Sequence, residues 1–264
     1  MIEVRDLYKT FNPQTPLENP VLRGLSLSLE QGEFVTVIGS NGAGKSTFLN
    51  ALAGDVIPDS GQILVGGREI THLSTYQRAA WISRVFQNPL LGTCADLSIE
   101  ENLALAIKRG RERYLSWAVK GSYQKRFADL LAPLGLGLEH RLRDKMGLLS
   151  GGQRQAVSLL MASLTNSEVL LLDEHTAALD PKTAHFVLEI TKRIVEEQKL
   201  TTLMVTHSMR QALDYGTRTV MLHQGKVVFD LRGEERAKAN IGDLLRLFER
   251  EQGESLSDDR LLME

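Results

Sequence analysis

The chain has 264 residues, of which 24% are charged, and a formal net charge of −2. This length is enough for a sizeable core and allows one large domain or two small ones. The near balance of charge gives no global electrostatic case for binding nucleic acid or an anionic membrane surface, so any partner must be recognised locally.

The start of the chain lacks the features of a secretory signal. Residues 1–6 read MIEVRD, without a basic segment followed by an apolar core, so we expect the protein to stay in the cytoplasm. No stretch approaches the roughly eighteen apolar residues of a membrane span, so any spanning must be done by another chain. The single cysteine, Cys94, excludes an internal disulfide and suits a reducing compartment.

The amino-terminal part is predicted to begin with strands. Period-two alternation at residues 2–5 and 25–29 favours half-buried antiparallel strands. A continuous β-prone run at 34–38 is typical of a strand buried on both faces. Helical spacing from residue 45 to 53 stops at Gly54, which predicts a helix with a glycine cap at its carboxyl end.

Helical, polar stretches replace this pattern between residues 88 and 155, notably at 99–108 and 123–134, and predict a separate helical lobe. Strand and helix then alternate again, which implies parallel strands joined by crossover helices. These later segments are a strand at 169–173, a helix at about 181–198 and a strand at 201–206.

The last third ends in a predicted hairpin and a tail. Residues 218–230, with Gln224 and Gly225 in the middle, favour a closing hairpin, and 241–251 an amphipathic helix. Docking of that helix on the chain's own core is the default expectation, and a dimer contact is the alternative. We therefore expect one domain over 1–230 and a helical tail over 231–264.

A glycine-rich loop follows the buried strand at 34–38. Residues 39–47 read GSNGAGKST and match the G-x-x-x-x-G-K-[ST] pattern of a phosphate-binding loop, or P-loop. Its glycines let backbone amides point inward around the β- and γ-phosphates, and Lys45 adds positive charge. Ser46 would offer its hydroxyl to Mg²⁺, and Thr47 could reach the α-phosphate. The predicted ATP-binding residues of this loop are Gly39, Ser40, Asn41, Gly42, Ala43, Gly44, Lys45, Ser46 and Thr47.

Two further motifs narrow the class of nucleotide-binding protein. Asp173 ends a run of apolar residues, so its carboxylate should emerge at the carboxyl edge of the sheet and hold Mg²⁺ through water. Residues 149–153 read LSGGQ. Together with the P-loop, these motifs resemble the ATP-binding-cassette (ABC) ATPases, from residue 2 to about residue 230. The resemblance implies an α/β fold: a P-loop NTPase core with a mainly parallel sheet, an antiparallel β subdomain and an inserted α-helical lobe.

The resemblance also assigns roles to single residues. Glu174 matches the general base that polarises the attacking water, and His207 the switch histidine that contacts the γ-phosphate. Gln87 matches the glutamine that coordinates Mg²⁺ when ATP is bound and reports the nucleotide state to the helical lobe. Phe11 lies where the family places an aromatic that stacks on adenine, with Tyr8 as a rival and a core role as the alternative.

In the family, the LSGGQ signature of one cassette closes on the ATP bound to the P-loop of another. The working unit is then a head-to-tail dimer, and this chain, with one copy of each motif, must pair with itself or with a homologous chain. The signature residues here are Leu149, Ser150, Gly151, Gly152 and Gln153, at the start of a helix predicted from about Gln153. Asp180 matches the D-loop that crosses the interface and, before Pro181, also suits a helix cap.

Two departures from the common pattern bear on function. His175 stands where the family commonly has proline, and we expect it to alter loop stiffness rather than to sense pH. Residues 144–147 lack the acidic segment typical of exporter cassettes, which favours an importer. The stretch 173–180 resembles an importer branch partnered with binding proteins, for amino acids or similar small solutes.

The leading hypothesis is the ATP-hydrolysing subunit of a membrane importer of a small solute, with ATP and Mg²⁺ as cofactors. It would lie at the cytoplasmic face of the cell membrane beside a separate permease with a solute-binding protein, and would bind no nucleic acid. The permease would dock on the lobe near Leu90, Leu91, Leu97 and Ile99, unless these residues form the core of the lobe. The alternative is a soluble ABC ATPase of an assembly scaffold without a permease.

Overall fold

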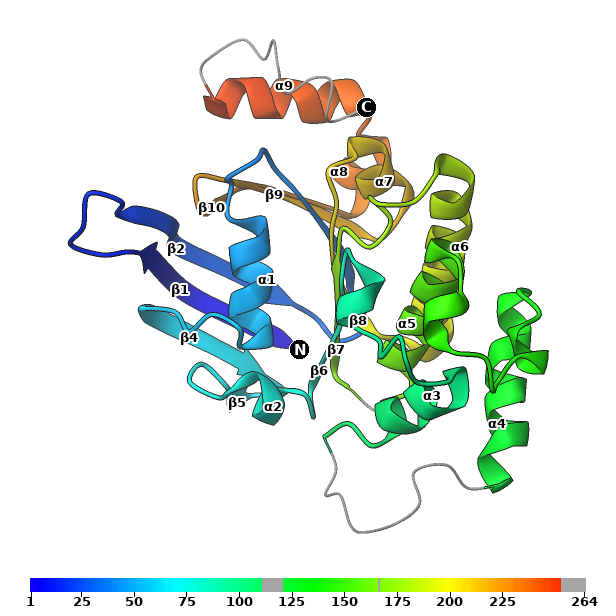
Figure 1. Cartoon of the computed structure of the whole chain (residues 1–264). Coiled ribbons are helices and arrows are strands. Elements are labelled where there is room, and N and C mark those ends of the chain that lie inside the picture. The colour runs from blue at the N-terminus through cyan, green and yellow to red at the C-terminus, as the bar shows by residue number, and fades with distance from the viewer. Residues whose placement is uncertain (111–120, 166, 253–264) are drawn as a thin grey trace. The chain divides into compact units, whose positions relative to one another are not determined.

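The computed structural model describes residues 1–110, 121–165 and 167–252 (Figure 1). The chain divides into two compact units, the first made of Met1–Arg78 and the chain from Lys199, the second of Ala79–Gln198. Parts of the predicted lobe (111–120) and tail (253–264) lie outside the described residues. The division into cassette, lobe and tail stays a prediction.

The first unit contains an antiparallel sheet in the order β2-β1-β4-β5. Its strands are β1 (Ile2–Phe11), β2 (Asn19–Leu29), β4 (Ser60–Val65) and β5 (Arg68–Glu69). Along β2 the alternation is visible, since Leu25, Leu27 and Leu29 are buried while Ser26 and Ser28 are exposed. Both predicted antiparallel strands are confirmed, and both are longer than their alternating segments.

The first unit also contains the strand that leads into the P-loop. This strand, β3 (Phe34–Ile38), is buried along its whole length and lies parallel to β8 (Thr201–Val205) on one side and β9 (Arg218–His223) on the other. β10 (Lys226–Arg232) pairs antiparallel with β9. The predicted buried strand, the later parallel strand and the closing hairpin are confirmed (Figure 1).

Five helices accompany these strands in the described part of the first unit. The helix α1 (Lys45–Ala53) ends at Gly54 in a left-handed conformation, with a φ of 89°, so the predicted glycine cap is confirmed. At φ values near this one, glycine avoids the clash that a Cβ atom would cause. The other four are α2 (Thr75–Arg78), α7 (Met209–Asp214), α8 (Gly233–Lys238) and α9 (Ile241–Gln252).

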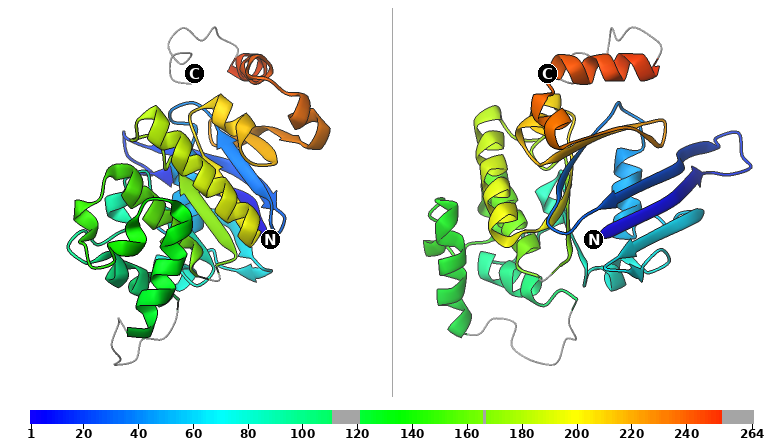
Figure 2. Two further views of the ribbon diagram at one scale, coloured as in Figure 1. Left: turned by 90° about the vertical axis from the view of Figure 1, so that its right-hand side faces the viewer. Right: turned by 180° about the vertical axis from the view of Figure 1, so that it is seen from behind.

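The carboxyl-terminal helix α9 docks on the core of its own unit, as the default expectation had it (Figure 2). Leu244 and Phe248 are fully buried in a cluster with Ile38, at the end of β3, and Met221 of β9. The His223 ring also meets the Phe248 ring edge-on, with 6.4 Å between ring centroids. The apolar stripe of α9 is therefore used within the unit.

The second unit combines two parallel strands with the helical segments. β6 (Ile82–Val85) pairs with β7 (Val169–Asp173), and α6 (Pro181–Gln198) has the predicted bounds. The two predicted lobe helices are confirmed as α3 (Ile99–Ile107) and α4 (Gly121–Leu131). The remaining elements are α5 (Gly151–Ser163) and the short 3₁₀ turns η1 (Pro89–Leu91), η2 (Ala132–Leu134), η3 (Leu138–His140) and η4 (Met146–Leu148).

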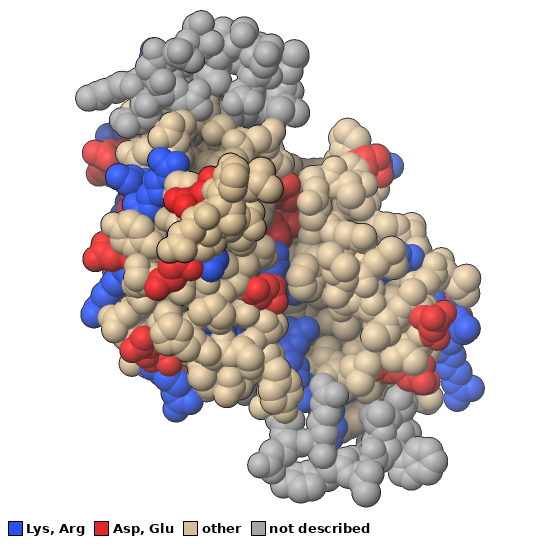
Figure 3. All heavy atoms as spheres, turned by 60° about the vertical axis from the view of Figure 1, so that its left-hand side comes forward, with Lys and Arg blue, Asp and Glu red and all other residues tan. Residues whose placement is uncertain are grey.

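The surface follows the near balance of charge in the composition. On the face shown in Figure 3, basic and acidic side chains are interspersed. No helix among the described residues has the length and apolar character needed to cross a membrane.

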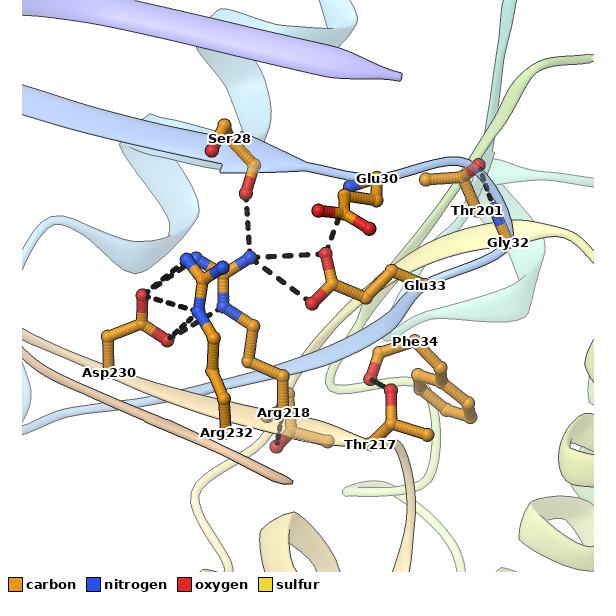
Figure 4. Close-up of polar contacts among 11 residues, drawn as sticks. Ser28, Glu30, Gly32, Glu33, Phe34, Thr201, Thr217, Arg218, Asp230 and Arg232 are labelled. Atoms are coloured by element: carbon orange, nitrogen blue, oxygen red, sulfur yellow. Dashed lines mark hydrogen bonds and ion pairs between the residues drawn. The ribbon is translucent and has the colours of Figure 1, made fainter. Parts of the chain in front are cut away.

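A buried arginine joins four segments of the first unit (Figure 4). The Arg218 guanidinium on β9 donates to both carboxylate oxygens of Asp230 at 2.7 Å, to the Ser28 carbonyl oxygen at 2.7 Å and to Glu33 at 3.1 Å. Paired, planar contacts of this kind are the strong form of an arginine–carboxylate bond. Arg218 therefore ties β9 to β10, to β2 and to the segment that enters β3.

Arg218→Met is expected to lower the free energy of unfolding by about 3 kcal/mol, because it leaves two partly buried carboxylates without their main cation. Arg232→Met is the matched control, since Arg232 contacts the same Asp230 but its side chain is 52% exposed, against 2% for Arg218. The control should lose less than about 1 kcal/mol. Urea unfolding of both variants measures the difference, and equal losses would show that burial does not decide the effect.

Candidate functional site

The P-loop leaves β3 through a turn that requires glycine. Gly39 has a φ of 151°, and a Cβ atom there would lie 2.2 Å from the Leu222 carbonyl oxygen of β9. Gly44, with a φ of 99°, occupies the cap position of α1 without a side-chain cap hydrogen bond, and the first turn of α1 has no acidic residue. The amide groups at this helix start can therefore receive an anion.

Lys45 is buried at the first position of α1. Its ammonium donates hydrogen bonds to the carbonyl oxygens of Gly39 at 2.6 Å and Ser40 at 3.1 Å. These contacts hold the positive charge against the loop, where phosphate oxygens would meet it. The Ser46 side chain is exposed at the same helix start, so its hydroxyl can reach a cation in solvent.

The hairpin turn between β9 and β10 braces the P-loop. The Gly225 amide donates to the Ala43 carbonyl oxygen at 3.0 Å, and the Gly225 carbonyl accepts from the Arg23 amide of β2 at 3.1 Å. A Cβ atom at Gly225 would lie 2.2 Å from the Val21 carbonyl oxygen. The sequence indicated this turn but carried no signal that it supports the loop.

His207 emerges at the same sheet edge as the P-loop. β8 ends at Val205, which is paired with Val37 of β3, and the Thr206 amide donates to the Val37 carbonyl oxygen at 3.1 Å. The carboxyl ends of parallel strands meet at one edge, where ligands bind in open α/β folds. The first unit therefore brings together the P-loop and the predicted switch histidine.

The two aromatic candidates for adenine stacking lie on β1. Phe11 is half-buried at the end of the strand, with the Lys9 ammonium 5.8 Å from its ring centroid. Tyr8 lies across Gly24 of β2, where a Cβ atom would be 2.8 Å from the tyrosine hydroxyl. The stacking role of Phe11, with Tyr8 as its rival, stays a prediction.

In the second unit, Asp173 is held by an arginine that the sequence analysis did not single out. Arg84 on β6 donates to Oδ2 of Asp173 at 2.5 Å, and both side chains are largely buried. The Arg84 guanidinium also lies over the Phe86 ring, 4.7 Å from its centroid, as in a cation–π contact. The sequence signal that could have identified Arg84 is its charge inside a short apolar strand. The predicted Mg²⁺ ligand is thus oriented through one of its two oxygens.

Glu174 has a backbone conformation that is rare for its residue type. Its φ of 43° lies in the left-handed region, which for a residue other than glycine is strained. The next side chain, His175, is buried, and its Nε2 lies 3.0 Å from the Thr191 hydroxyl of α6. Burial lowers the pKa of His175 to about 4, so the ring is neutral near neutral pH, in line with the expectation that it does not sense pH there.

The signature segment starts a helix earlier than predicted. α5 begins at Gly151, not near Gln153, because Ser150 is the helix cap: its hydroxyl accepts from the Gln153 amide at 3.3 Å. The Gln153 side chain accepts from the Ser150 amide at 3.1 Å, which completes a capping box. The amides of both glycines therefore belong to the first turn of α5.

Asp180 caps α6, since its Oδ1 accepts from the Thr183 amide at 3.1 Å. Hydrogen bonds from the Thr183 side chain and then from the Thr183 amide lower the pKa of the Asp180 carboxyl. The predicted cap is confirmed, and the D-loop role stays a prediction. Gln87 lies two residues after the end of β6, and its side chain is exposed to solvent.

The four candidates for a permease groove divide by burial. Leu90 and Leu91 of η1 are exposed, Leu97 is half-buried, and Ile99 is fully buried. Ile99 therefore belongs to the core of the second unit, so for this residue the alternative of a core role is confirmed. The two exposed leucines keep the docking role as a prediction.

The residues fit a Mg²⁺ ion that is held jointly with a nucleotide. Among the described residues, no group of three or more His, Cys, Asp or Glu side chains could hold a metal ion. Mg²⁺ commonly keeps several waters and takes one or two protein ligands besides substrate phosphates. The exposed Ser46 hydroxyl in the first unit and the oriented Asp173 carboxylate in the second are each an oxygen ligand of the kind that Mg²⁺ takes.

Comparisons with known proteins agree with one another. The model of the family described as "ABC transporter" matches residues 22–177. A "Tyrosine transport ATP-binding protein" of Clostridioides difficile is 45% identical over 249 residues, 94% of this chain and 99% of the relative. "Methionine import ATP-binding protein MetN 2" of Pseudomonas entomophila is 34% identical and covers 86% of this chain, which spans 66% of that relative.

Solved structures show the same likeness. A dimeric post-hydrolysis state of the ATP-binding cassette MJ0796, bound to ADP and phosphate, has a TM-score of 0.73 and 28% identity, covering 88% of this chain and 98% of that one. The ADP conformation of the cassette MJ1267 has a TM-score of 0.77 and 27% identity, covering 96% of this chain and 99% of that one.

Proposed function

Since this chain belongs to the ABC transporter family and is an ATPase that powers an importer, we propose that the imported solute is an amino acid. The observation that carries this proposal is the 45% identity, over 94% of this chain, to a tyrosine transport ATP-binding protein. The fold is that of the family's P-loop cassette, with a parallel sheet, an antiparallel sheet and helices. The scaffold alternative is not favoured, because the similar proteins include tyrosine, methionine and thiamine transport subunits.

We assign the chemistry to the residues built up above. The amides at the start of α1 and the Lys45 ammonium would hold the β- and γ-phosphates, with Ser46 and Asp173 as donors for Mg²⁺. When bound, Mg²⁺ neutralises phosphate charge and orients the γ-phosphate. Glu174 would polarise the attacking water, and His207 would steady it at the sheet edge that the P-loop shares.

The second phosphate contact would come from another cassette in a head-to-tail dimer. The Ser150 hydroxyl accepts a hydrogen bond from the Gln153 amide, so its own O–H remains a donor for a phosphate oxygen. The amides of the first turn of α5 are further donors for that phosphate, because they lie at a helix start. Dimeric cassettes among the similar structures support this assembly.

The assembly would be membrane-bound through a separate permease. The exposed Leu90 and Leu91, three and four residues after Gln87, are the proposed docking point, so that the nucleotide state at Gln87 reaches the permease. We place the cassette at the cytoplasmic face of the cell membrane as a peripheral subunit. A solute-binding protein would deliver the amino acid on the other side.

Ser150→Arg is expected to abolish ATP-dependent dimerisation while a single chain still binds ATP. The long cationic side chain would occupy the place of the partner's phosphate, whereas the P-loop lies in the other unit. Analytical ultracentrifugation with and without ATP measures the dimer, in a Glu174→Gln background that slows turnover. Ser150→Ala, which removes only the hydroxyl, should weaken the dimer less. An unchanged ATP-dependent dimer in Ser150→Arg would contradict the proposed interface.

The solute proposal is tested on the whole transporter. The Glu174→Gln variant of the cassette, with ATP and Mg²⁺, is used to capture partners from detergent-solubilised native membranes. Mass spectrometry then identifies these partners. The permease and binding protein found there are then reconstituted in proteoliposomes with wild-type cassette. We expect tyrosine or another amino acid to stimulate ATP hydrolysis and sugars to have no effect. Stimulation of ATP hydrolysis by a sugar and by no amino acid would contradict the proposed solute. Capture of only soluble partners, after membrane proteins have been shown to be extracted, would contradict the transporter itself.

A further inference from the structure

His175 and Thr191 form a buried contact to which none of the roles above has been assigned. His175 is 2% exposed and Thr191 is 1% exposed, in the middle of α6. His175 Nε2 lies 3.0 Å from the Thr191 hydroxyl oxygen, and that hydroxyl donates its hydrogen to the Val187 carbonyl oxygen at 2.8 Å. A hydroxyl has a single hydrogen to donate. The imidazole is therefore the donor of this contact and carries its proton on Nε2.

This contact fixes the residue that follows Glu174. The left-handed backbone of Glu174 is strained and persists only where the surrounding structure determines it. After Glu174 the chain turns, with the Ala177 amide donating to the Glu174 carbonyl oxygen at 2.9 Å. The His175 side chain anchors the start of that turn on α6, a helix of 18 residues. The strain at Glu174 is thereby held against a rigid element.

The chemistry of residue 175 explains why an anchor is needed. A proline there, which is common in the family that the motifs resemble, would stiffen the turn through its ring, because the ring locks φ. Histidine has no such lock, and its backbone has the φ and ψ freedom of most residues. A buried side-chain hydrogen bond can supply the same restraint by other means.

We propose that His175 and Thr191 are a pair of positioning residues that hold the Glu174 carboxylate in its working place. The inference rests on the proposed role of Glu174 as the general base. The pair contacts neither nucleotide nor water in this scheme and acts only through the backbone of Glu174. Its loss should therefore slow the chemical step and leave ATP affinity and dimer closure intact.

Thr191→Val tests the pair, because valine keeps the shape of the side chain and removes the oxygen that accepts from His175. We expect kcat to fall about tenfold or more, the order of effect that a small misplacement of a catalytic group produces. KM for ATP and ATP-dependent dimerisation should change less than about twofold. Thr191→Ser, which keeps the hydroxyl, is the matched control and should retain nearly full kcat.

The outcomes separate this inference from the proposed function. Normal ATP turnover by Glu174→Gln would contradict both the role of Glu174 as the general base and the positioning role of the pair. An inactive Glu174→Gln with normal kcat in a folded Thr191→Val would overturn the positioning pair alone, as would a lowered melting temperature with unchanged kcat. If Thr191→Val does not fold, His175→Gln, which can still donate, is compared with His175→Leu. Equal kcat in those two variants would also overturn the pair.

Discussion

Glu174→Gln is expected to reduce ATP hydrolysis by at least about a hundredfold, because a general base commonly contributes that much or more to a proton transfer. Glutamine has nearly the same shape and cannot take the proton of the attacking water. ATP binding and ATP-dependent dimerisation should persist, since the P-loop and the signature are unchanged. Phosphate release measures the rate, and ultracentrifugation measures the dimer.

The matched control for this variant is Glu168→Gln, an exposed carboxylate just before β7 in the same unit. It should hydrolyse ATP at the wild-type rate. Turnover by Glu174→Gln within a few fold of the wild type would mean that another group activates the water.

Lys45→Ala is expected to weaken ATP binding by at least about a hundredfold, because it removes a charged donor from the phosphates in a buried setting. The ammonium is already held by two P-loop carbonyls, so little ordering is needed when phosphate arrives. Isothermal titration with ATP and Mg²⁺ measures the affinity.

Circular dichroism must accompany that titration, since Lys45→Ala also loses two hydrogen bonds within the loop. Lys226→Ala, an exposed lysine on β10, is the control and should bind ATP normally. A folded Lys45→Ala protein with wild-type affinity would contradict the phosphate role of this lysine.

Local patterns were enough to predict several elements to within a residue. β3, α1, β7 and α6 are each bounded by a strong local signal: a continuous apolar run, a glycine cap, or an Asp-Pro start. The P-loop and the signature could also be identified from the sequence, because each places its functional groups within a few consecutive residues.

Other parts depend on partners far away in the chain. β6 contains Arg84 and Ser83, so its apolar pattern is weak, and its arginine gains a meaning only from Asp173, 89 residues later. The sequence showed that His175 departs from the family's common proline. Its partner Thr191, however, lies 16 residues later, on the buried face of α6. Single-sequence reasoning identifies such side chains more readily than their contacts.

The arrangement of β3 has a consequence for the making of the protein. Both of its neighbours, β8 and β9, lie far downstream, with Thr201 about 160 residues after Ile38. At about 5 to 20 residues per second, a ribosome needs roughly 8 to 30 seconds to reach the start of β8, and longer to supply β9. During that interval the strand that delivers the P-loop is an apolar segment without its native partners. A nascent chain therefore acquires its nucleotide-binding loop late. Residues 34–38 would need chaperone protection during synthesis more than a strand whose partner follows it directly in the sequence.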